Sequence, residues 1–272
     1  EAGDEADLEG HVCDRLRDIV DQRVYPAWTG DSNQCIAGEI EPEARESVLR
    51  ITNFHRSLAH LPPVEVATLE QSSLQECALM MDANQSINHH PPEDWRCYTV
   101  AGMAKAGRSN LAGQNAVDAV SLYMIDRGNQ TTMGHRRWIM SKGLRTIGVG
   151  STDRYSCMEV LHLNRQQGWV AYPPAGEFPI QLLADRWSSI DDTGWTIQMN
   201  GISGDDPQVE VTTEETSLAV EVNALLPNYG SEKAFSIIPQ GWSSQAGVSY
   251  HVRVTGLSED IEYTVDMVDC RL

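Results

Sequence analysis

The chain has 272 residues, of which 41% are hydrophobic and 22% charged, a composition typical of a globular protein with one large domain or two smaller ones. Its net charge of −19 would repel phosphate backbones, which argues against a nucleic-acid-binding protein. No apolar run approaches the ~20 residues that a membrane-spanning helix needs, so no transmembrane segment is expected.

The acidic residues are concentrated at the two ends of the chain. Residues 1–42 hold 11 acidic and 3 basic residues, residues 200–272 hold 12 and 3, and residues 43–180 hold 13 of each. The first ten residues carry five acids and no base, which predicts a disordered tail. We therefore expect an acidic extension over residues 1–42, a central domain over 43–180, and a linker with a second domain over 181–272.

Six cysteines are spread along the chain without a Cys-x-x-Cys pair: Cys13, Cys35, Cys77, Cys97, Cys157 and Cys270. This pattern favours disulfides in a secreted, periplasmic or cell-surface protein, and buried free thiols in a cytosolic protein are the alternative. The expected pairs are Cys13–Cys35 and Cys77–Cys97, which close short loops, and Cys157–Cys270. The chain begins at Glu1 without a signal peptide, as a mature secreted form would.

Two helices are predicted in the first third of the chain. The first spans residues 42–59, because Pro42 suits the first helical position and the pair Pro62-Pro63 ends the pattern. Its buried stripe is Val48, Ile51, His55 and Leu58. The second helix opens with the capping-box pattern Thr68-x-x-Gln71, and its apolar face is Leu74, Cys77, Ala78 and Met81.

A third helix is predicted over residues 111–125 and strands over 146–150, 157–163 and 169–172. Beyond Trp195 the apolar residues alternate with polar ones, as in Tyr250, Val252 and Val254. Helices followed by strands predict the α+β class. The turn spacing from about residue 195 to 272 predicts a small all-β, Ig-like sandwich.

Two histidine clusters carry the clearest chemical signal. The first is His89-His90-Pro91-Pro92 and the second is Gly134-His135-Arg136-Arg137. If the fold brings His89 or His90 to His135, the imidazoles form a polar cleft that can hold a metal, a carboxylate or a small ligand.

The middle of the chain resembles the CAP superfamily of cysteine-rich secretory proteins, antigen 5 and pathogenesis-related proteins. The resemblance is carried in order by Asn53-Phe54-His55-Arg56, His89, Ser109-Asn110-Leu111, Gly134-His135 and Gly148-Val149-Gly150. It is closer to a bacterial SCP-like branch with a C-terminal β extension, through Trp95–Thr99, Gly134–Ile139 and Pro173–Gly176. The resemblance covers residues 43–272 and implies an α-β-α sandwich with a cleft.

In many members of that family the cleft holds two histidines and two acidic residues. The resemblance places the histidines at His89 and His135, with His90 as the alternative, and the second acid at Asp126. Ser109 stands where the family often has glutamate, so affinity for a divalent cation should fall. His90, Asn110 and Arg136 complete the expected ligand-binding set.

Three kinds of chemistry fit these residues. His89 and His135 with a carboxylate could bind zinc or another divalent cation and leave one position open. Ser109 with a histidine and Asp126 would form a triad-like set, although Ser109 as a helix N-cap is favoured because no Gly-x-Ser-x-Gly segment is present. Arg136 and Arg137 are expected in a strand, one paired with Asp126 or Glu159 and the other facing an anionic ligand.

The expected function is a secreted CAP-like protein that binds a small molecule, lipid, peptide or cell-envelope glycan in the histidine cleft. One alternative is an extracellular hydrolase, with or without a metal, that uses His89, His135 and Asp126. Another is an adhesion or toxin-like module that acts through the acidic β-sandwich.

Overall fold

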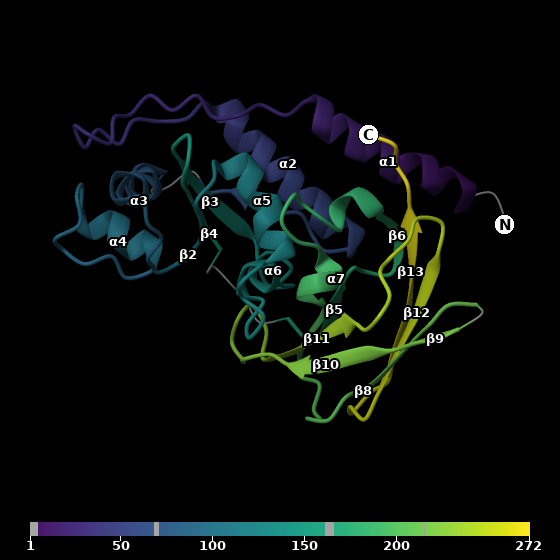
Figure 1. Ribbon diagram of the computed structural model, residues 1–272. Coiled ribbons are helices and arrows are strands. Elements are labelled where there is room, and N and C mark those ends of the chain that lie inside the picture. Colours follow the sequence, from purple (N-terminus) through teal and green to yellow (C-terminus); the bar gives the residue numbers. More distant parts are fainter. Residues whose placement is uncertain (1–4, 68–70, 161–165, 215) are drawn as a thin grey trace.

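The computed structural model describes residues 5–67, 71–160, 166–214 and 216–272 (Figure 1). Its helices are α1 (Glu5–Asp21), α2 (Pro42–Leu58), α3 (Gln71–Asn84), α4 (Val100–Ala106), α5 (Ala116–Ile125), α6 (Gly134–Ile139) and the short α7 (Ile190–Thr193), with a 3₁₀ turn η1 (Ile180–Leu182). None of the helices in the described ranges is both long enough and apolar enough to cross a membrane.

The first half of the chain forms three layers around a four-stranded sheet. Its strands are β1 (Glu65–Val66), β2 (Ser109–Ala112), β3 (Thr146–Ser151) and β4 (Ser156–Glu159), in the order β1-β3-β4-β2. β1 runs parallel to β3, and the other pairs are antiparallel. Helices α3 and α4 lie on one side of the sheet and α2 and α5 on the other (Figure 1). This is the α-β-α arrangement that the family resemblance implied.

The second half of the chain is an all-β region of two sheets. Its strands are β5 (Gly168–Tyr172), β6 (Gly176–Pro179), β7 (Trp195–Asn200), β8 (Gln208–Thr212), β9 (Ser217–Leu218), β10 (Val220–Ala224), β11 (Lys233–Pro239), β12 (Ser249–Thr255) and β13 (Ile261–Val268). One sheet has the order β10-β11-β7-β5 and the other β6-β13-β12-β8-β9. Alternate residues of β12 are buried, as the pattern of Tyr250, Val252 and Val254 predicted.

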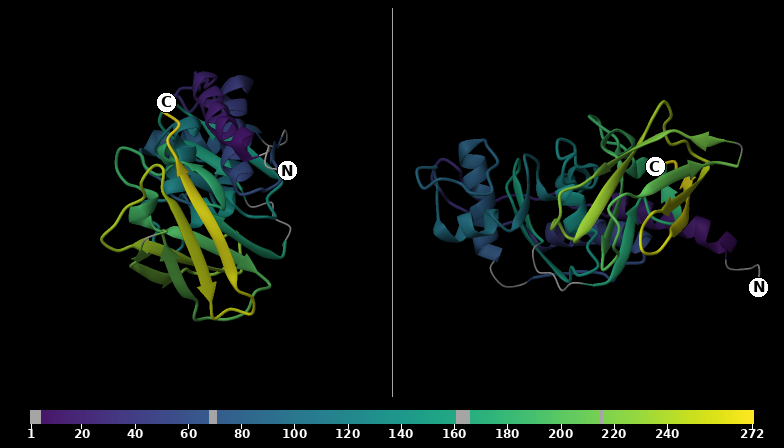
Figure 2. Two further views of the ribbon diagram at one scale, coloured as in Figure 1. Left: turned by 90° about the vertical axis from the view of Figure 1, so that its right-hand side faces the viewer. Right: turned by 90° about the horizontal axis from the view of Figure 1, so that it is seen from below.

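The α+β class and the all-β region after the CAP-type sandwich are therefore confirmed. Strand pairing crosses the expected boundary at residue 180, because β5 pairs with β7 and β6 pairs with β13. Buried residues of both halves, such as Phe54, Tyr123, Trp195 and Val252, belong to one continuous hydrophobic core. The two halves are thus packed together, with α3 and α4 at one end and the β region at the other (Figure 2).

Several predicted elements differ from those observed. A helix occupies the expected disordered tail from Glu5 onward. The third predicted helix begins at Ala116 instead of residue 111, because residues 109–112 form β2 and the Asn115 side chain caps the helix by accepting from the backbone N–H groups of Val117 and Asp118. Thr68 of the expected capping box and residues 161–163 of the expected second strand lie outside the described residues.

All three expected disulfide pairings are wrong. The structure joins Cys13 to Cys270, Cys35 to Cys97 and Cys77 to Cys157. Helix α3 packs on β4 and brings Cys77 to Cys157, while α1 packs beside β6, whose neighbour β13 ends just before Cys270 (Figure 1). Packing between distant elements therefore decides the pairs, and the preference of an unfolded chain for short loops does not.

Candidate functional site

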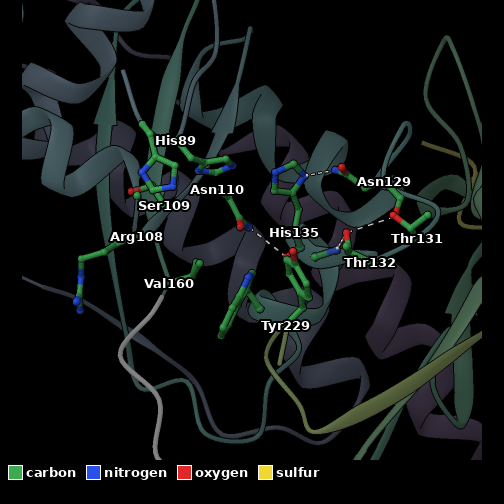
Figure 3. A pocket seen from close by; sticks show the side chains of 14 residues that line it. His89, Arg108, Ser109, Asn110, Asn129, Thr131, Thr132, His135, Val160 and Tyr229 are labelled. Atoms are coloured by element: carbon green, nitrogen blue, oxygen red, sulfur yellow. Dashed lines mark hydrogen bonds between the residues drawn. The ribbon is translucent and has the colours of Figure 1, made fainter. Parts of the chain in front are cut away.

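A cavity of about 430 Å³ lies where β2, the segment after α5, α6 and the turn between β10 and β11 meet. His89, His90 and His135 all line it (Figure 3), although His135 is 46 positions beyond His89 in the chain. The other described residues that line it are Gly107, Arg108, Ser109, Asn110, Asn129, Thr131, Thr132, Gly134, Trp138, Val160 and Tyr229. A cavity of this size is typical of sites for small ligands.

His135 is held by a buried carboxylate behind it. The Nδ1 atom lies 2.9 Å from Asp126 Oδ1 and 3.1 Å from Asn129 Nδ2. Asp126 can only accept a hydrogen bond, and Asn129 Nδ2 already donates to the same carboxylate oxygen at 2.8 Å. We therefore assign the proton of His135 to Nδ1, which leaves the lone pair of Nε2 on the side of the ring that faces the cavity (Figure 3).

Asp126 owes its position to the end of α5. It caps this helix in the left-handed conformation, with φ of 60°, which turns its side chain toward the start of α6. There its Oδ2 atom accepts the backbone N–H of Arg136 at 3.2 Å. Asp126 is buried and is not among the residues that line the cavity, so it orients His135 from behind, as the triad-like alternative expected, and does not face a ligand as a second acid of the cleft would.

His89 comes from the segment after α3, and its ring is also oriented by an acceptor. Its Nδ1 atom lies 2.9 Å from the carbonyl oxygen of Ala106, which fixes the proton on Nδ1 and the lone pair on Nε2. The backbone N–H of His90 donates to Asn88 Oδ1 at 2.8 Å, and the exposed His90 side chain also lines the cavity.

Ser109 and Asn110 form the floor of the cavity on β2. Asn110 donates to the backbone carbonyl of His135 at 3.1 Å and so ties the strand to α6. Ser109 is a buried strand residue, not the expected helix cap, and its Oγ atom has no hydrogen-bond partner among the described residues. The structure therefore forms an Asp126–His135 pair, but no hydrogen bond there joins Ser109 to a histidine to complete the expected triad.

Arg136 and Arg137 lie in helix α6, not in a strand as predicted. The Arg136 guanidinium is fully buried and donates to Met124 O at 2.5 Å, Gly194 O at 2.6 Å and Ile125 O at 3.0 Å. Burial lowers the pKa of Arg136 to about 10, so the side chain stays protonated at neutral pH. Arg136 does not line the cavity, which corrects its expected role in ligand binding.

The second acid considered for these arginines is engaged elsewhere. Glu159 is buried in β4 and forms ion pairs with Lys105 Nζ at 2.9 Å and Arg108 Nε at 3.0 Å. Neither Arg136 nor Arg137 therefore takes Glu159 as the partner that was expected for one of them.

The residues around the cavity do not fit a metal site of the expected kind. The described residues contain no group of three or more His, Cys, Asp or Glu side chains that could hold a metal ion. Asp126 is engaged behind His135, and Ser109 offers a hydroxyl where a carboxylate would be needed. The expected pair, His89 and His135, falls short by itself of the three protein ligands of catalytic zinc sites.

Eight described residues of the cavity wall were not identified from the sequence: Asn129, Thr131, Thr132, Trp138, Gly107, Arg108, Val160 and Tyr229. The first four lie within six positions of His135, so their closeness to that histidine in the sequence could have identified them. Tyr229 is 94 positions away in the β region, and no local pattern links it to the histidines.

One comparison with known proteins gave a match. Residues 49–161 match the family model of CAP, the Cysteine-rich secretory protein family. Comparisons with curated proteins and with solved structures gave no match. The matched segment begins in α2, ends just after β4, and includes both histidine clusters together with Ser109 and Asp126. Residues 49–161 of the chain are therefore similar to the CAP family, and the match covers less than half of the chain.

Proposed function

We propose that this protein acts outside the cytosol and binds a small polar ligand in the cavity between the CAP domain and the β region, with a saccharide unit of a cell-envelope glycan as the best fit. The observation that carries the proposal is the cavity wall. It presents two imidazoles whose Nε2 atoms accept hydrogen bonds, the amides of Asn110 and Asn129, and several hydroxyl groups.

The same wall argues against a lipid in this cavity. Among the described residues that line it, Val160 is the one aliphatic side chain, and Trp138 and Tyr229 are the aromatic ones. A lipid chain would bury the polar side chains without offering them hydrogen bonds, which costs free energy for each group. A ligand that carries hydroxyl or amide groups along with a compact apolar face matches the wall better.

The cysteines and the family similarity support a location outside the cytosol. All six cysteines form disulfides, which persist in oxidising compartments and are rare in the cytosol. The CAP family is named for secreted proteins. Membership of a bacterial SCP-like branch with a C-terminal β extension is part of this proposal, and the ordered sequence motifs support it.

Binding to an array of defined glycans, including soluble peptidoglycan fragments and N-acetylglucosamine oligomers, tests the proposal. The strongest binder is then titrated calorimetrically against the wild type, a His135→Gln variant and a His60→Asn control. His60 is exposed, lies outside the cavity and has a φ of 52°, which asparagine tolerates. We expect His135→Gln to weaken binding at least tenfold and His60→Asn to leave it unchanged; equal affinities in all three proteins would refute the cavity as the binding site.

One observation favours a second candidate, a hydrolase. The 2.9 Å hydrogen bond from His135 to the buried Asp126 is the arrangement that prepares an imidazole to act as a general base toward a water or hydroxyl in the cavity. A screen of ester, amide and glycoside substrates would show activity that falls at least a hundredfold in His135→Gln. Hydrolysis rates at background level for both the wild type and a His89→Gln/His135→Gln variant would rule out this second function.

The third expected role, an adhesion or toxin-like module formed by the β region alone, has no such observation in its favour. The β region shares its core with the CAP domain and supplies Tyr229 to the cavity, so the two parts act on one site in our proposal.

A further inference from the structure

One wall of the cavity comes from outside the matched CAP domain. The turn between β10 and β11, defined here as the 226–231 turn, reaches across to α6 and places Tyr229 in the cavity wall opposite His89 (Figure 3). Tyr229 is half-buried, and a ligand in the cavity would contact its ring.

The 226–231 turn is attached to α6 by hydrogen bonds from a buried arginine. Arg137 Nη1 donates to the carbonyl oxygens of Leu226 at 2.7 Å and Thr132 at 2.8 Å, and its Nη2 donates to Ser231 Oγ at 3.0 Å. Burial lowers the pKa of Arg137 to about 10, so these bonds keep a charged donor at neutral pH.

Two more hydrogen bonds hold the turn at its ends. The backbone N–H of Leu226 donates to the carbonyl of Thr131 at 2.9 Å, and Ser141 Oγ donates to the carbonyl of Gly230 at 2.7 Å. Because these partners lie on α6 and on the segments that flank it, the turn cannot move away from the cavity without breaking several buried bonds.

Glycine at two positions lets the ring come this close. Gly230 has a φ of 72°, and a Cβ atom there would lie 2.3 Å from the backbone oxygen of Arg137. At Gly134 a Cβ atom would lie 2.8 Å from Tyr229 Cδ1, so the residue before His135 leaves room for the aromatic ring. The Tyr229 ring then sits beside Trp138, with 6.3 Å between ring centroids and an interplanar angle of 57°.

We propose that Tyr229 is a specificity-determining residue of the cavity and that it selects a ligand with a sugar ring. This inference rests on the proposed function and names the feature of the ligand that the β region recognises. A pyranose ring has an apolar C–H face that packs on an aromatic side chain, while its hydroxyl groups point outward to hydrogen-bonding partners. The cavity offers both, because the neighbouring rings of Tyr229 and Trp138 line it together with the amides of Asn110 and Asn129 and the imidazoles.

Two measurements on the full chain test the inference, and the first needs no ligand. Diethyl pyrocarbonate modifies histidine, and peptide mass spectrometry gives the rate at His135 relative to the exposed His60 of the same molecule. We expect Tyr229→Ala to raise this relative rate at least threefold because a wall is removed. Tyr229→Phe, and Tyr25→Ala at an exposed tyrosine outside the cavity, should leave it unchanged. An unchanged rate in Tyr229→Ala would overturn the assignment of Tyr229 to the wall.

The second measurement compares N-acetylglucosamine with its reduced open-chain form, N-acetylglucosaminitol, by NMR titration. The two probes carry the same amide and similar hydroxyl groups, but only the first has a ring. We expect the wild type and Tyr229→Phe to prefer the ring form at least tenfold, and Tyr229→Ala to lose most of that preference. His135→Gln should lower the affinity for both probes by a similar factor.

The outcomes separate this inference from the function on which it rests. An undiminished ring preference in Tyr229→Ala overturns the inference and leaves saccharide binding in place. If neither probe binds, the saccharide ligand is contradicted both in this inference and as the best fit in the proposed function. The modification rate at His135 then still shows whether Tyr229 forms part of the cavity wall.

Discussion

At the scale of single residues, hydrogen-bond acceptors behind the histidines decide what the cavity can do. Asp126 and the carbonyl of Ala106 each accept a hydrogen bond from the Nδ1–H group of an imidazole, so His135 and His89 both present Nε2 as an acceptor. Ser109 is the opposite case, because its buried hydroxyl has no partner among the described residues. Each arrangement leads to a prediction.

Replacing Asp126 with asparagine should reverse the tautomer of His135. The backbone N–H of Arg136 cannot change, so the asparagine oxygen should keep that bond and its NH₂ group should face His135 Nδ1. The proton then moves to Nε2, which nitrogen-15 NMR of the imidazole detects directly. A His135 ring that keeps its Nδ1 proton in Asp126→Asn would show that the carboxylate does not set the tautomer.

Ser109→Ala should cost little stability or even raise it, within about 1 kcal/mol, because no hydrogen bond of the described residues is lost and a buried polar atom is removed. Ser151 is the matched control, a buried strand serine whose Oγ donates to Thr152 O at 2.7 Å and accepts the Ala116 N–H at 2.9 Å. Ser151→Ala should lower the free energy of unfolding by about 1–2 kcal/mol. Urea denaturation measures both, and equal losses would contradict the prediction.

At the scale of elements, a buried histidine joins the α-β-α half of the chain to the β region. His55 of α2 lies with its Nδ1 atom 2.7 Å from the Tyr172 hydroxyl of β5, and both side chains are buried. Burial raises the pKa of Tyr172 and lowers that of His55 to about 4, so the phenol donates to a neutral imidazole. The contact depends on His55 remaining unprotonated.

This contact predicts a loss of stability in acid. Between pH 6.5 and about 4 the unfolded chain binds a proton at residue 55 that the folded protein does not. The contribution of neutral His55 to the free energy of unfolding is therefore fully present above pH 6.5 and is lost as the pH falls toward 4. The free energy of unfolding is lowered by about 3 kcal/mol at the acidic end of this pH range, since each unit of pKa difference corresponds to roughly 1.4 kcal/mol. Unfolding curves across this range for the wild type and His55→Gln measure the difference, since glutamine accepts from Tyr172 without titrating. Parallel pH profiles would show that His55 is not the group responsible.

At the scale of the whole molecule, the two ends of the chain are tied together. The Cys13–Cys270 disulfide joins α1 to the end of the β region across 257 residues, and both halves share one core. Closing so long a loop restricts the unfolded chain strongly. The Cys35–Cys97 disulfide spans only 62 residues, which makes it a suitable comparison.

Removing the Cys13–Cys270 disulfide by a double alanine substitution should lower the free energy of unfolding by about 2–5 kcal/mol. The loss should exceed that of the Cys35→Ala/Cys97→Ala variant by about 1 kcal/mol, because loop-closure entropy grows with the logarithm of loop length. Guanidinium denaturation under non-reducing conditions measures both variants. A smaller loss for the longer loop would mean that strain or local packing, not chain entropy, dominates.

Much of the architecture follows from the sequence itself, because its patterns are local. A stripe at helical spacing marked α2 and placed His55 on its buried face, and the alternation of Tyr250, Val252 and Val254 marked β12. The CAP motifs from Asn53 to Gly150 lie within residues 49–161, the segment that matches the family model, and both histidine clusters line one cavity in the structure. These features depend on residues close together in the chain or on short motifs, so a single sequence can carry them.

The tertiary structure alone decided the features that depend on distant partners. The disulfide pairs follow from α1 packing beside the sheet that contains β13 and from α3 packing on β4, and loop length did not reveal them. Ser109 lies in a strand because β4 pairs with β2. The Arg136 guanidinium donates its hydrogen bonds to backbone carbonyls around α6. Tyr229 enters the cavity because Arg137 holds a turn of another sheet in place. Packing between segments far apart in the chain creates all of these contacts, and a local pattern contains no information about which distant segment will be the neighbour.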